Sequence, residues 1–322
     1  MAEASIPVDL FNPGQVFACL GFLEAADALL DDAEGGFDWA DESNVQFRLR
    51  AESEVSPFGA VLEFLATAIP RRWAPVGFAD DPQNEDKTGD GSQREDANAA
   101  AVATGEAPGA SALEFSETFV AAEGDRMSLP IRLGGGNRPT IELGHWADGS
   151  SRDGFKLYAG NRSAEGIARA MLMGVRDKPK KRSSIGEIRT KGIRQLWDEQ
   201  RNELIARPLH VLTPMGGSFN FDPRGAWTAI DAGYSLNDQG HLVEASPVVE
   251  MLAALGLEHA RPDEFDTRKV RYAAWGGLLP PILARAALCG SLSVVPLRHF
   301  RFELDMSGKN KVVTFAQMEA RS

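Results

Sequence analysis

Cysteine is nearly absent from this sequence, as are long apolar runs. Of the 322 residues only Cys19 and Cys289 are cysteines, which excludes a disulfide framework and a four-cysteine zinc site. No stretch reaches the roughly 18 uninterrupted apolar residues of a membrane span, and the first residues do not form a secretion signal. Two unpaired thiols are typical of a reducing compartment, so we expect a cytoplasmic protein.

The motifs of common catalytic and metal sites are also missing. The sequence contains no HExxH pair, no GxSxG turn and no GxxxxGK[ST] loop. Its five histidines are widely spaced and none belongs to a Cys–His cluster: His145, His210, His241, His259 and His299. We therefore expect no catalytic residues, no metal site and no cofactor.

Negative charge is concentrated in the first part of the chain. The net charge is −12, to which residues 1–125 contribute −19 and the remaining residues +7. Residues 79–111 combine acidic side chains with small and polar residues and contain almost no large apolar residue, a composition typical of disorder. We predict a disordered acidic insertion at 79–111 in one domain that is formed by residues 1–78 and 112–322.

Hydrophobic periodicity predicts an α+β fold with mainly antiparallel sheets, because runs of strands are interspersed with helices. Helices are expected at 13–30, 57–69, 163–175, 185–206 and 248–257 and in a segment ending near residue 288. Strands are expected at 6–10, 45–52, 114–121, 128–133, 140–146, 155–160, 270–275, 293–305 and 311–319. Asn12 and Ser163 are the expected caps of the first and third helices.

The strongest local electrostatic feature is residues 169–207, with 11 basic and 5 acidic side chains. Four basic residues fall in a connector and three on the helix expected to follow it: Lys178, Lys180, Lys181, Arg182, Arg189, Lys191 and Arg194. A basic loop that leads into a helix can follow a phosphate backbone. The alternative is a solvated helix face, on which Glu187–Lys191 and Arg194–Asp198 are ordinary ion pairs.

A glycine-rich segment, Gly134–Arg138, lies between two expected strands. Its backbone could form a phosphate-binding nest with Asn137, and Arg138 would add charge. The segment lacks the strand-to-helix context of a nucleotide site, so a hairpin turn is the favoured interpretation.

Two stretches resemble a CRISPR-associated family of type I systems of subtype U, also called subtype G. The residues Phe11–Glu24, FNPGQVFACLGFLE, are similar to the NPGQ-F-A-C-x-G-L-L-E opening of that family. The residues Pro247–Glu258, PVVEMLAALGLE, followed by Arg261-Pro262, are similar to its P-x-x-E-x-L-A-A-L-G-L…R-P segment. The matches come from both ends of the chain.

The resemblance implies a subunit of Cascade, the complex in which CRISPR RNA pairs with invading DNA. It implies the position of the large subunit, which is not a catalyst and contacts the protospacer-adjacent motif, the displaced strand and the helicase–nuclease. The partners would be other Cascade subunits, CRISPR RNA and target DNA. In that setting the basic region would hold backbone phosphates, and Asn12 and Gln15 could read base edges through their amides. For Asn12 a helix-cap role is the alternative.

Two other functions remain open. A metal-dependent CRISPR nuclease or processing enzyme would require acidic pairs such as Asp263/Glu264 to converge on further carboxylates in the fold. A structural adaptor would use the acidic segment 79–111 to mimic nucleic acid or to occupy a basic partner.

Overall fold

The fold is α+β, as predicted, and its sheets are antiparallel. The computed structural model describes residues 1–72, 131–134, 139–144, 155–158, 163–177, 187–225, 243–307 and 310–319. The α-helices in these ranges are α1 (Pro13–Leu30), α2 (Pro57–Thr67), α4 (Ala164–Met173), α5 (Ile193–Ala206), α7 (Pro247–His259) and α8 (Pro281–Leu288). A short 3-10 helix, η3, spans Pro223–Gly225.

The strands of the described ranges form five antiparallel sheets. One has the order β1 (Ala2–Pro7), β3 (Gln46–Ala51), β2 (Glu34–Asp38), and another the order β4 (Ile69–Arg72), β5 (Ile131–Gly134), β6 (Ile141–Leu143). The largest has the order β11 (Asp263–Asp266), β12 (Lys269–Trp275), β13 (Leu297–Ser307), β14 (Asn310–Val313), and β15 (Gln317–Met318) also pairs with β13. Two ribbons pair β7 (Val175–Arg176) with β8 (Ile188–Thr190) and β9 (Thr213–Pro214) with β10 (Glu244–Ala245).

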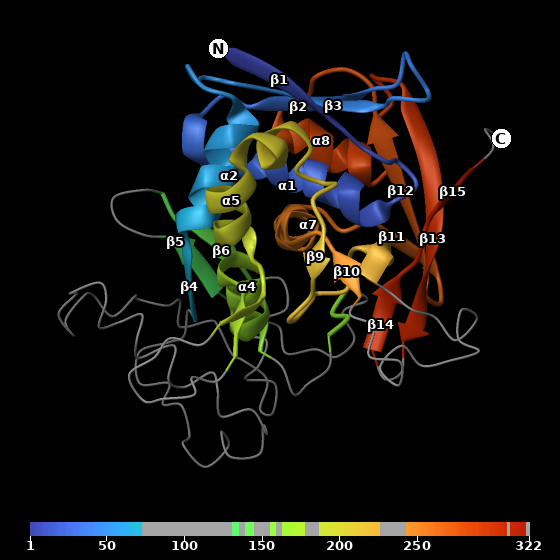
Figure 1. Cartoon of the computed structure of the whole chain (residues 1–322). Helices are drawn as coiled ribbons and strands as arrows, with labels where there is room; N and C mark the ends of the chain where they lie inside the picture. Colours follow the sequence, from blue (N-terminus) through green and yellow to red (C-terminus); the bar gives the residue numbers. More distant parts are fainter. Residues whose placement is uncertain are drawn as a thin grey trace, which may run out of the picture.

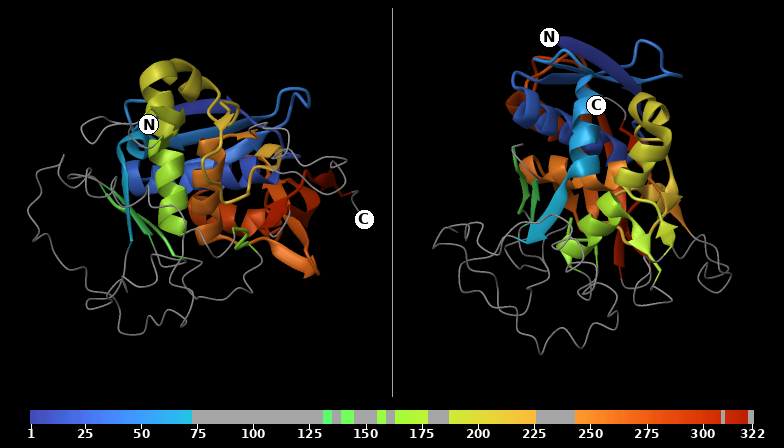
Figure 2. Two further views of the ribbon diagram at one scale, coloured as in Figure 1. Left: turned by 60° about the horizontal axis from the view of Figure 1, so that its bottom comes forward. Right: turned by 60° about the vertical axis from the view of Figure 1, so that its left-hand side comes forward.

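Helices α1 and α7 occupy the middle of the molecule (Figure 1). The β1–β3–β2 sheet covers one end, the sheet that contains β12 and β13 covers one side, and α2 and α5 lie on the opposite side (Figures 1 and 2). Every residue of α1 from Pro13 to Ala26 and of α7 from Pro247 to Leu257 is buried. Both helices are therefore enclosed by other elements rather than lying half in solvent.

Helix α1 is long and apolar enough to cross a membrane by length and composition, but 78% of its 18-residue stretch is buried in the structure. This burial is typical of a core helix. The ring of Phe17 packs edge-on against Tyr272 of β12, at 5.6 Å between ring centres, and Phe22 packs against Phe58 of α2 at 5.0 Å. The side chains of α1 thus join the largest sheet to the helices on the other side.

The crossing of α1 and α7 depends on two glycines. A Cβ atom at Gly21 would overlap the carbonyl oxygen of Leu252, and a Cβ at Gly256 would overlap the carbonyl oxygen of Phe17. The two backbones are therefore in direct contact, and any larger residue must push the helices apart.

Three buried helices begin with the same local signal, a polar cap followed by proline. The side chains of Asn12, Ser56 and Ser246 accept hydrogen bonds from backbone N–H groups of the first turn, at 3.1, 3.5 and 3.3 Å. Proline follows each cap, because its missing N–H is not needed at the first helical position. The cap role predicted for Asn12 is confirmed, as is that of Ser163 in α4.

Helix α8 is tied to α1 by a buried carboxylate. The side chain of Glu24 is 5% exposed and accepts two hydrogen bonds from the guanidinium of Arg285, both at 2.7 Å. The imidazole of His259, at the end of α7, lies 3.8 Å from the same carboxylate. An acidic residue of an apolar helix is thereby paired inside the fold rather than exposed.

The helices predicted at 13–30, 57–69, 163–175 and 248–257 and near residue 288 are confirmed within a few residues. The helix predicted at 185–206 begins only at Ile193, because 188–190 pair with β7 as a strand and Gly192 caps the helix. The strand predicted at 155–160 is wrong for 155–158, where the backbone is irregular. The strand predicted at 114–121 and the insertion predicted at 79–111 lie outside the described residues.

The substitution Gly21→Ala should destabilise the protein by about 1–3 kcal/mol, because the new methyl group cannot fit against the backbone of α7. As a control, Gly59→Ala in α2 should be neutral or stabilising by roughly 0.5 kcal/mol, because its Cβ would meet its nearest neighbour at an ordinary 3.6 Å. Chemical denaturation of both variants measures the difference. Equal stability of the two variants would contradict the close crossing.

Candidate nucleic-acid interface

The basic connector predicted from sequence joins the two strands of a short antiparallel ribbon. Strands β7 and β8 pair Val175 with Thr190 and Arg176 with Ile188, and the N–H of Asp177 donates to the carbonyl of Glu187 at 2.8 Å. The four predicted contact residues of the connector lie outside the described residues: Lys178, Lys180, Lys181 and Arg182. The structure therefore shows that the two ends of the connector lie side by side, at the ends of β7 and β8.

A buried amide anchors the base of this ribbon. The side-chain oxygen of Gln195 accepts a hydrogen bond from the N–H of Gly192 at 2.8 Å, and its NH₂ group donates to the carbonyl of Met173 at 2.9 Å. Gln195 thus links the last turn of α4 to the first turn of α5. Along the chain the ribbon lies between α4 and α5, which contact one another, and α4 also contacts β4.

The basic side chains on and after β8 are in different electrostatic situations. Arg189 is exposed and has no ion pair within the described part of the chain. Lys191 pairs with Glu199, and the Nε atom of Arg194 donates to the carbonyl of Ala66 in α2 at 2.9 Å. Of these three predicted contact residues, Lys191 and Arg194 already have partners within the fold, whereas the guanidinium of Arg189 is available to a ligand.

The ion pairs expected for a solvated helix face do not form within the described residues. Glu187 lies before β8 rather than on the helix, so the predicted Glu187–Lys191 pair is wrong, and Lys191 uses Glu199 instead. Arg194 turns to the end of α2, so the predicted pair with Asp198 is also wrong. On the outer face of α5 the guanidinium of Arg201 lies 4.1 Å from the centre of the Trp197 ring. This contact leaves the arginine charge at the surface.

The structure contradicts the expectation that Gln15 reads a base edge. Gln15 is only 2% exposed, and its side-chain oxygen accepts a hydrogen bond from the N–H of Asp9 at 2.9 Å. Its amide holds the turn that precedes α1. Asn12 is fully buried as well, so neither amide is available to nucleic acid.

The two strands on either side of the glycine-rich segment pair with each other. Strands β5 and β6 pair antiparallel, with Ile131 opposite Leu143 and Leu133 opposite Ile141. This pairing agrees with the favoured interpretation of the segment as a hairpin connection. Asn137 and Arg138 lie outside the described residues, so their proposed phosphate contact stays a prediction.

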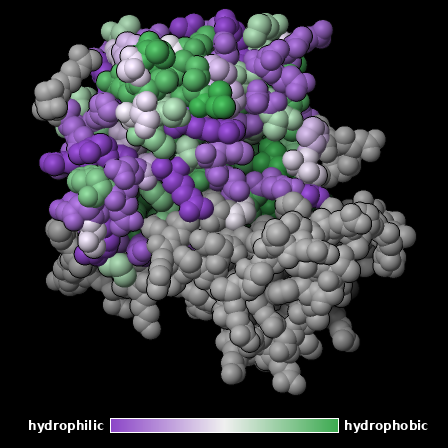
Figure 3. All heavy atoms as spheres, turned by 180° about the vertical axis from the view of Figure 1, so that it is seen from behind, coloured by the Kyte–Doolittle hydropathy of each residue, from purple (hydrophilic) through white to green (hydrophobic). Residues whose placement is uncertain are grey.

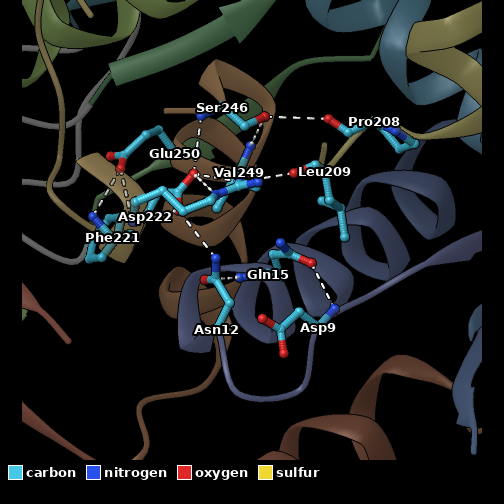
Figure 4. A network of polar contacts seen from close by, with 11 residues as sticks. Asp9, Asn12, Gln15, Pro208, Leu209, Phe221, Asp222, Ser246, Val249 and Glu250 are labelled. Atoms are coloured by element: carbon cyan, nitrogen blue, oxygen red, sulfur yellow. Dashed lines mark hydrogen bonds and ion pairs between the residues drawn. The ribbon is translucent and has the colours of Figure 1, made fainter. Parts of the chain in front are cut away.

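A buried network of polar groups joins the beginnings of α1 and α7 (Figure 4). At its centre Asp222 accepts hydrogen bonds from the side-chain NH₂ of Asn12 at 3.2 Å and from the N–H of Ser246 at 3.0 Å. The guanidinium of Arg224 donates to both oxygens of the same carboxylate, at 2.8 and 2.6 Å, and to the carbonyl of Leu209 at 2.8 Å. Asp222 is thus paired, hydrogen-bonded and buried, the arrangement that an interior charge requires.

The second carboxylate of the network, Glu250, holds the chain before Asp222. It is fully buried and accepts hydrogen bonds from the N–H groups of Phe219, Phe221 and Asp222, at 2.8, 3.1 and 2.8 Å. Burial raises the pKa of Glu250 to about 7, against the opposing effect of these backbone donors. Glu250 therefore satisfies backbone N–H groups that have no strand partner in this irregular segment.

Sequence patterns did not reveal this network, although most of its members lie in or beside the two stretches that carry the family resemblance. Asn12, Gln15 and Glu250 belong to those stretches, and Ser246 precedes the second. The only local signal was a carboxylate in the first turn of an apolar helix after a Ser-Pro cap. Nothing in the sequence identified Asp222 as the partner of Asn12, which lies 210 positions away.

No group of three or more His, Cys, Asp or Glu side chains that could hold a metal ion occurs among the described residues. The acidic pair Asp263 and Glu264, named for the nuclease alternative, lies on the exposed edge strand β11. Asp263 is opposite Arg271, and Glu264 accepts a hydrogen bond from the N–H of Arg268 at 2.9 Å. These contacts are those of a solvated strand edge.

The stability of the protein should depend on pH through Glu250. Because its pKa is raised from 4.5 to about 7 on folding, the folded chain keeps this proton at pH values where the unfolded chain loses it. The stabilisation is fully present below pH 4.5 and is lost as the pH rises to about 7. Relative to Glu250→Gln, wild type should lose on the order of 2–3 kcal/mol between pH 5 and pH 8, measured by urea unfolding. A pH-independent difference would contradict the raised pKa.

Known proteins do not supply a function for this arrangement. No family model, no curated protein and no solved structure matches the chain. The functional assignment therefore depends on the residues and contacts of this chain itself.

Proposed function

We propose that the protein is a non-catalytic subunit of a CRISPR RNA-guided DNA surveillance complex of the Cascade type. In this proposal it works in the cytoplasm and contacts the backbone of target DNA or guide RNA. Its partners are the other Cascade subunits, CRISPR RNA, target DNA and the helicase–nuclease, and it contributes to contact with the protospacer-adjacent motif. The observation that carries the proposal is the β7–β8 ribbon, which presents the most basic segment of the chain beside the exposed Arg189.

The charge distribution supports a backbone contact. The chain as a whole is acidic, yet residues 169–207 carry 11 basic and 5 acidic side chains. A segment whose two ends are fixed by a ribbon can follow a phosphate backbone without a preformed pocket. Such contacts position a strand and leave sequence recognition to base pairing with the guide.

The family resemblance supports the same proposal through the fold. The two stretches that carry it form α1 and α7, whose polar ends meet in the Asp222–Glu250 network (Figure 4). Residues that look like family signatures are therefore explained as packing and capping residues. Their similarity to the family's motifs therefore supports a similar packing of these two helices in that family. The contacts with nucleic acid are expected on the surface instead.

An exposed apolar surface supports docking to other subunits. Figure 3 shows hydrophobic residues gathered on the face turned away from the viewer in Figure 1, on the side where α8 lies. On α8 Ile282 is 70% exposed and Leu283 38%, and Val294, in the segment after α8, is 75% exposed. Exposed apolar patches of this kind mark protein–protein contacts.

The first experiment replaces Lys178, Lys180, Lys181 and Arg182 together by Glu. Target-DNA affinity of the assembled complex should fall at least tenfold, and the slope of log K against log salt should become less steep by about 0.9 for each phosphate that is no longer neutralised. The control reverses Arg268, Lys269, Arg301 and Lys311, which lie on or beside the largest sheet and change the net charge equally. Equal effects of both variants would show that only the net charge matters, and would contradict the assignment of the DNA contact to the ribbon.

The second experiment asks whether the chain belongs to an RNA-containing particle. The protein is co-expressed with the products of its neighbouring genes and purified by a tag on this chain alone. Co-elution of a defined RNA with several proteins supports the Cascade proposal. A lone protein that cleaves DNA with magnesium would favour the nuclease alternative, whereas a partner that no longer binds after deletion of 79–111 would favour the adaptor.

A further inference from the structure

A hollow at the edge of the β1–β3–β2 sheet lies apart from the β7–β8 ribbon. It has a volume of about 460 Å³ and lies where β2 meets the turn after β12. Single bridges join the two, between Gly35 and Leu279 and between Phe37 and Gly276. The hollow is lined by backbone and side chains of both segments, among them Gly36, Asp38, Trp39, Arg48, Gly277 and Leu278.

Glycines create the space. Gly36 lies opposite Arg48 in the β2–β3 ladder, and a Cβ at Gly36 would overlap the carbonyl oxygen of Gly277. Gly277 has a φ of +88°, and a Cβ there would meet no atom within 4 Å. The turn thus comes against β2 by backbone alone, and it leaves open space beside the strand.

Two charged side chains of opposite sign border this space. Asp38 follows Gly36 by two residues, so it shares a sheet face with Arg48 and is its diagonal neighbour. The Oδ1 atom of Asp38 accepts a hydrogen bond from the N–H of Ala40 at 3.0 Å, and Arg48 uses Nε and Nη2 to bind Glu3. Among the described residues, the Oδ2 atom of Asp38 and the Nη1 atom of Arg48 have no partner.

An indole ring held in one orientation forms a third wall. The guanidinium of Arg298 lies 4.7 Å from the centre of the Trp39 ring and pairs with Glu42 at 3.0 Å. The ring edge also lies against the backbone of Gly276. Trp39 is therefore a preorganised flat surface, although it follows the end of a strand.

These groups suit a planar ligand with both donors and acceptors. A phosphate is disfavoured, because Asp38 faces the same space. The carboxylate can accept from the N1–H and the N2 amino group of guanine, and the guanidinium can donate to its O6 or N7. Arg298 covers one face of the indole, so a base would stack on the opposite face.

We propose that this hollow binds a single unstacked guanine base. The base can belong to a nucleic-acid strand, which rests on the proposed function, or to a free guanine nucleotide, which does not. Both sources present the same base edges to Asp38 and Arg48, so separate probes are needed to distinguish them.

The first test uses two probes on the full chain: guanosine monophosphate, and labelled 12-residue oligothymidylates that carry one guanine, adenine or cytosine. Trp39→Ala should weaken binding of guanosine monophosphate and of the guanine strand by roughly fivefold to a hundredfold, because the stacking surface is removed. The salt dependence of strand binding should not change. The matched control is Phe265→Ala, which removes a 38% exposed ring that also lies under an arginine, with Arg271 at 4.4 Å, and it should have no effect.

The second variant, Asp38→Asn, keeps the stacking surface and removes the carboxylate. Preference for guanine over adenine should fall about tenfold, while binding of the adenine strand stays the same, because adenine has no N1–H donor to lose. Thermal unfolding of each variant shows whether the fold is intact. A preference for cytosine in the unmodified protein would overturn the assignment to guanine.

The outcomes separate this site from the proposed function. If strands bind equally whatever their single base, and Trp39→Ala has no effect, the guanine site is wrong and the backbone contact stands. If guanosine monophosphate binds through Trp39 but no strand binds, the guanine site stands with a free nucleotide as its ligand, and the proposed function is decided separately by the charge reversal in the assembled complex. If neither probe binds, the guanine site is overturned.

Discussion

The direct backbone contact between α1 and α7 is the constraint on which the rest of the structure depends. Gly21 and Gly256 allow it, since a side chain at either position would overlap the other helix. With both helices buried along most of their length, the surrounding sheets and helices are placed by the side chains that α1 and α7 present to them. The same contact brings the first turns of the two helices together, where their N–H groups lack helical partners. The side chains of Asn12 and Ser246 cap one N–H group in each first turn, and Asp222 accepts hydrogen bonds from both cap residues, so this part of the polar network follows from the crossing.

Much of the fold could be predicted because its signals are local. The cap-and-proline pairs at Asn12–Pro13 and Ser246–Pro247 and the continuous apolar runs after them locate α1 and α7. The failures have local causes as well. Ile185, Ile188 and Ile193 keep a helical spacing, but Gly192 caps α5 and 188–190 pair with β7 as a strand. The N–H groups of Phe219 and Phe221 bind the Glu250 carboxylate, and no local pattern reveals this partner on a distant helix.

The candidate site was predictable only in part, for a similar reason. Charge density along the sequence identified the segment that the β7–β8 ribbon presents, but not which charges the fold engages. Lys191 and Arg194 look equivalent to Arg189 in sequence, and only the structure shows that Glu199 and the end of α2 engage the first two. The prediction that Gln15 contacts a ligand is wrong because its amide accepts a hydrogen bond from the N–H of Asp9 inside the fold. The sequence motif alone does not distinguish this role from recognition of a base. The hollow beside Trp39 depends on a turn more than 200 residues away, which no local pattern could place.

The β4–β5 ladder has a consequence for how this chain tolerates change in length. Arg72 is the register partner of Ile131, so the two ends of the sequence between them are held a strand spacing apart by backbone hydrogen bonds. The distance between these two ends is therefore set by the ladder and not by the number of residues between them. This junction is a natural point at which to graft an affinity tag or a fluorescent reporter.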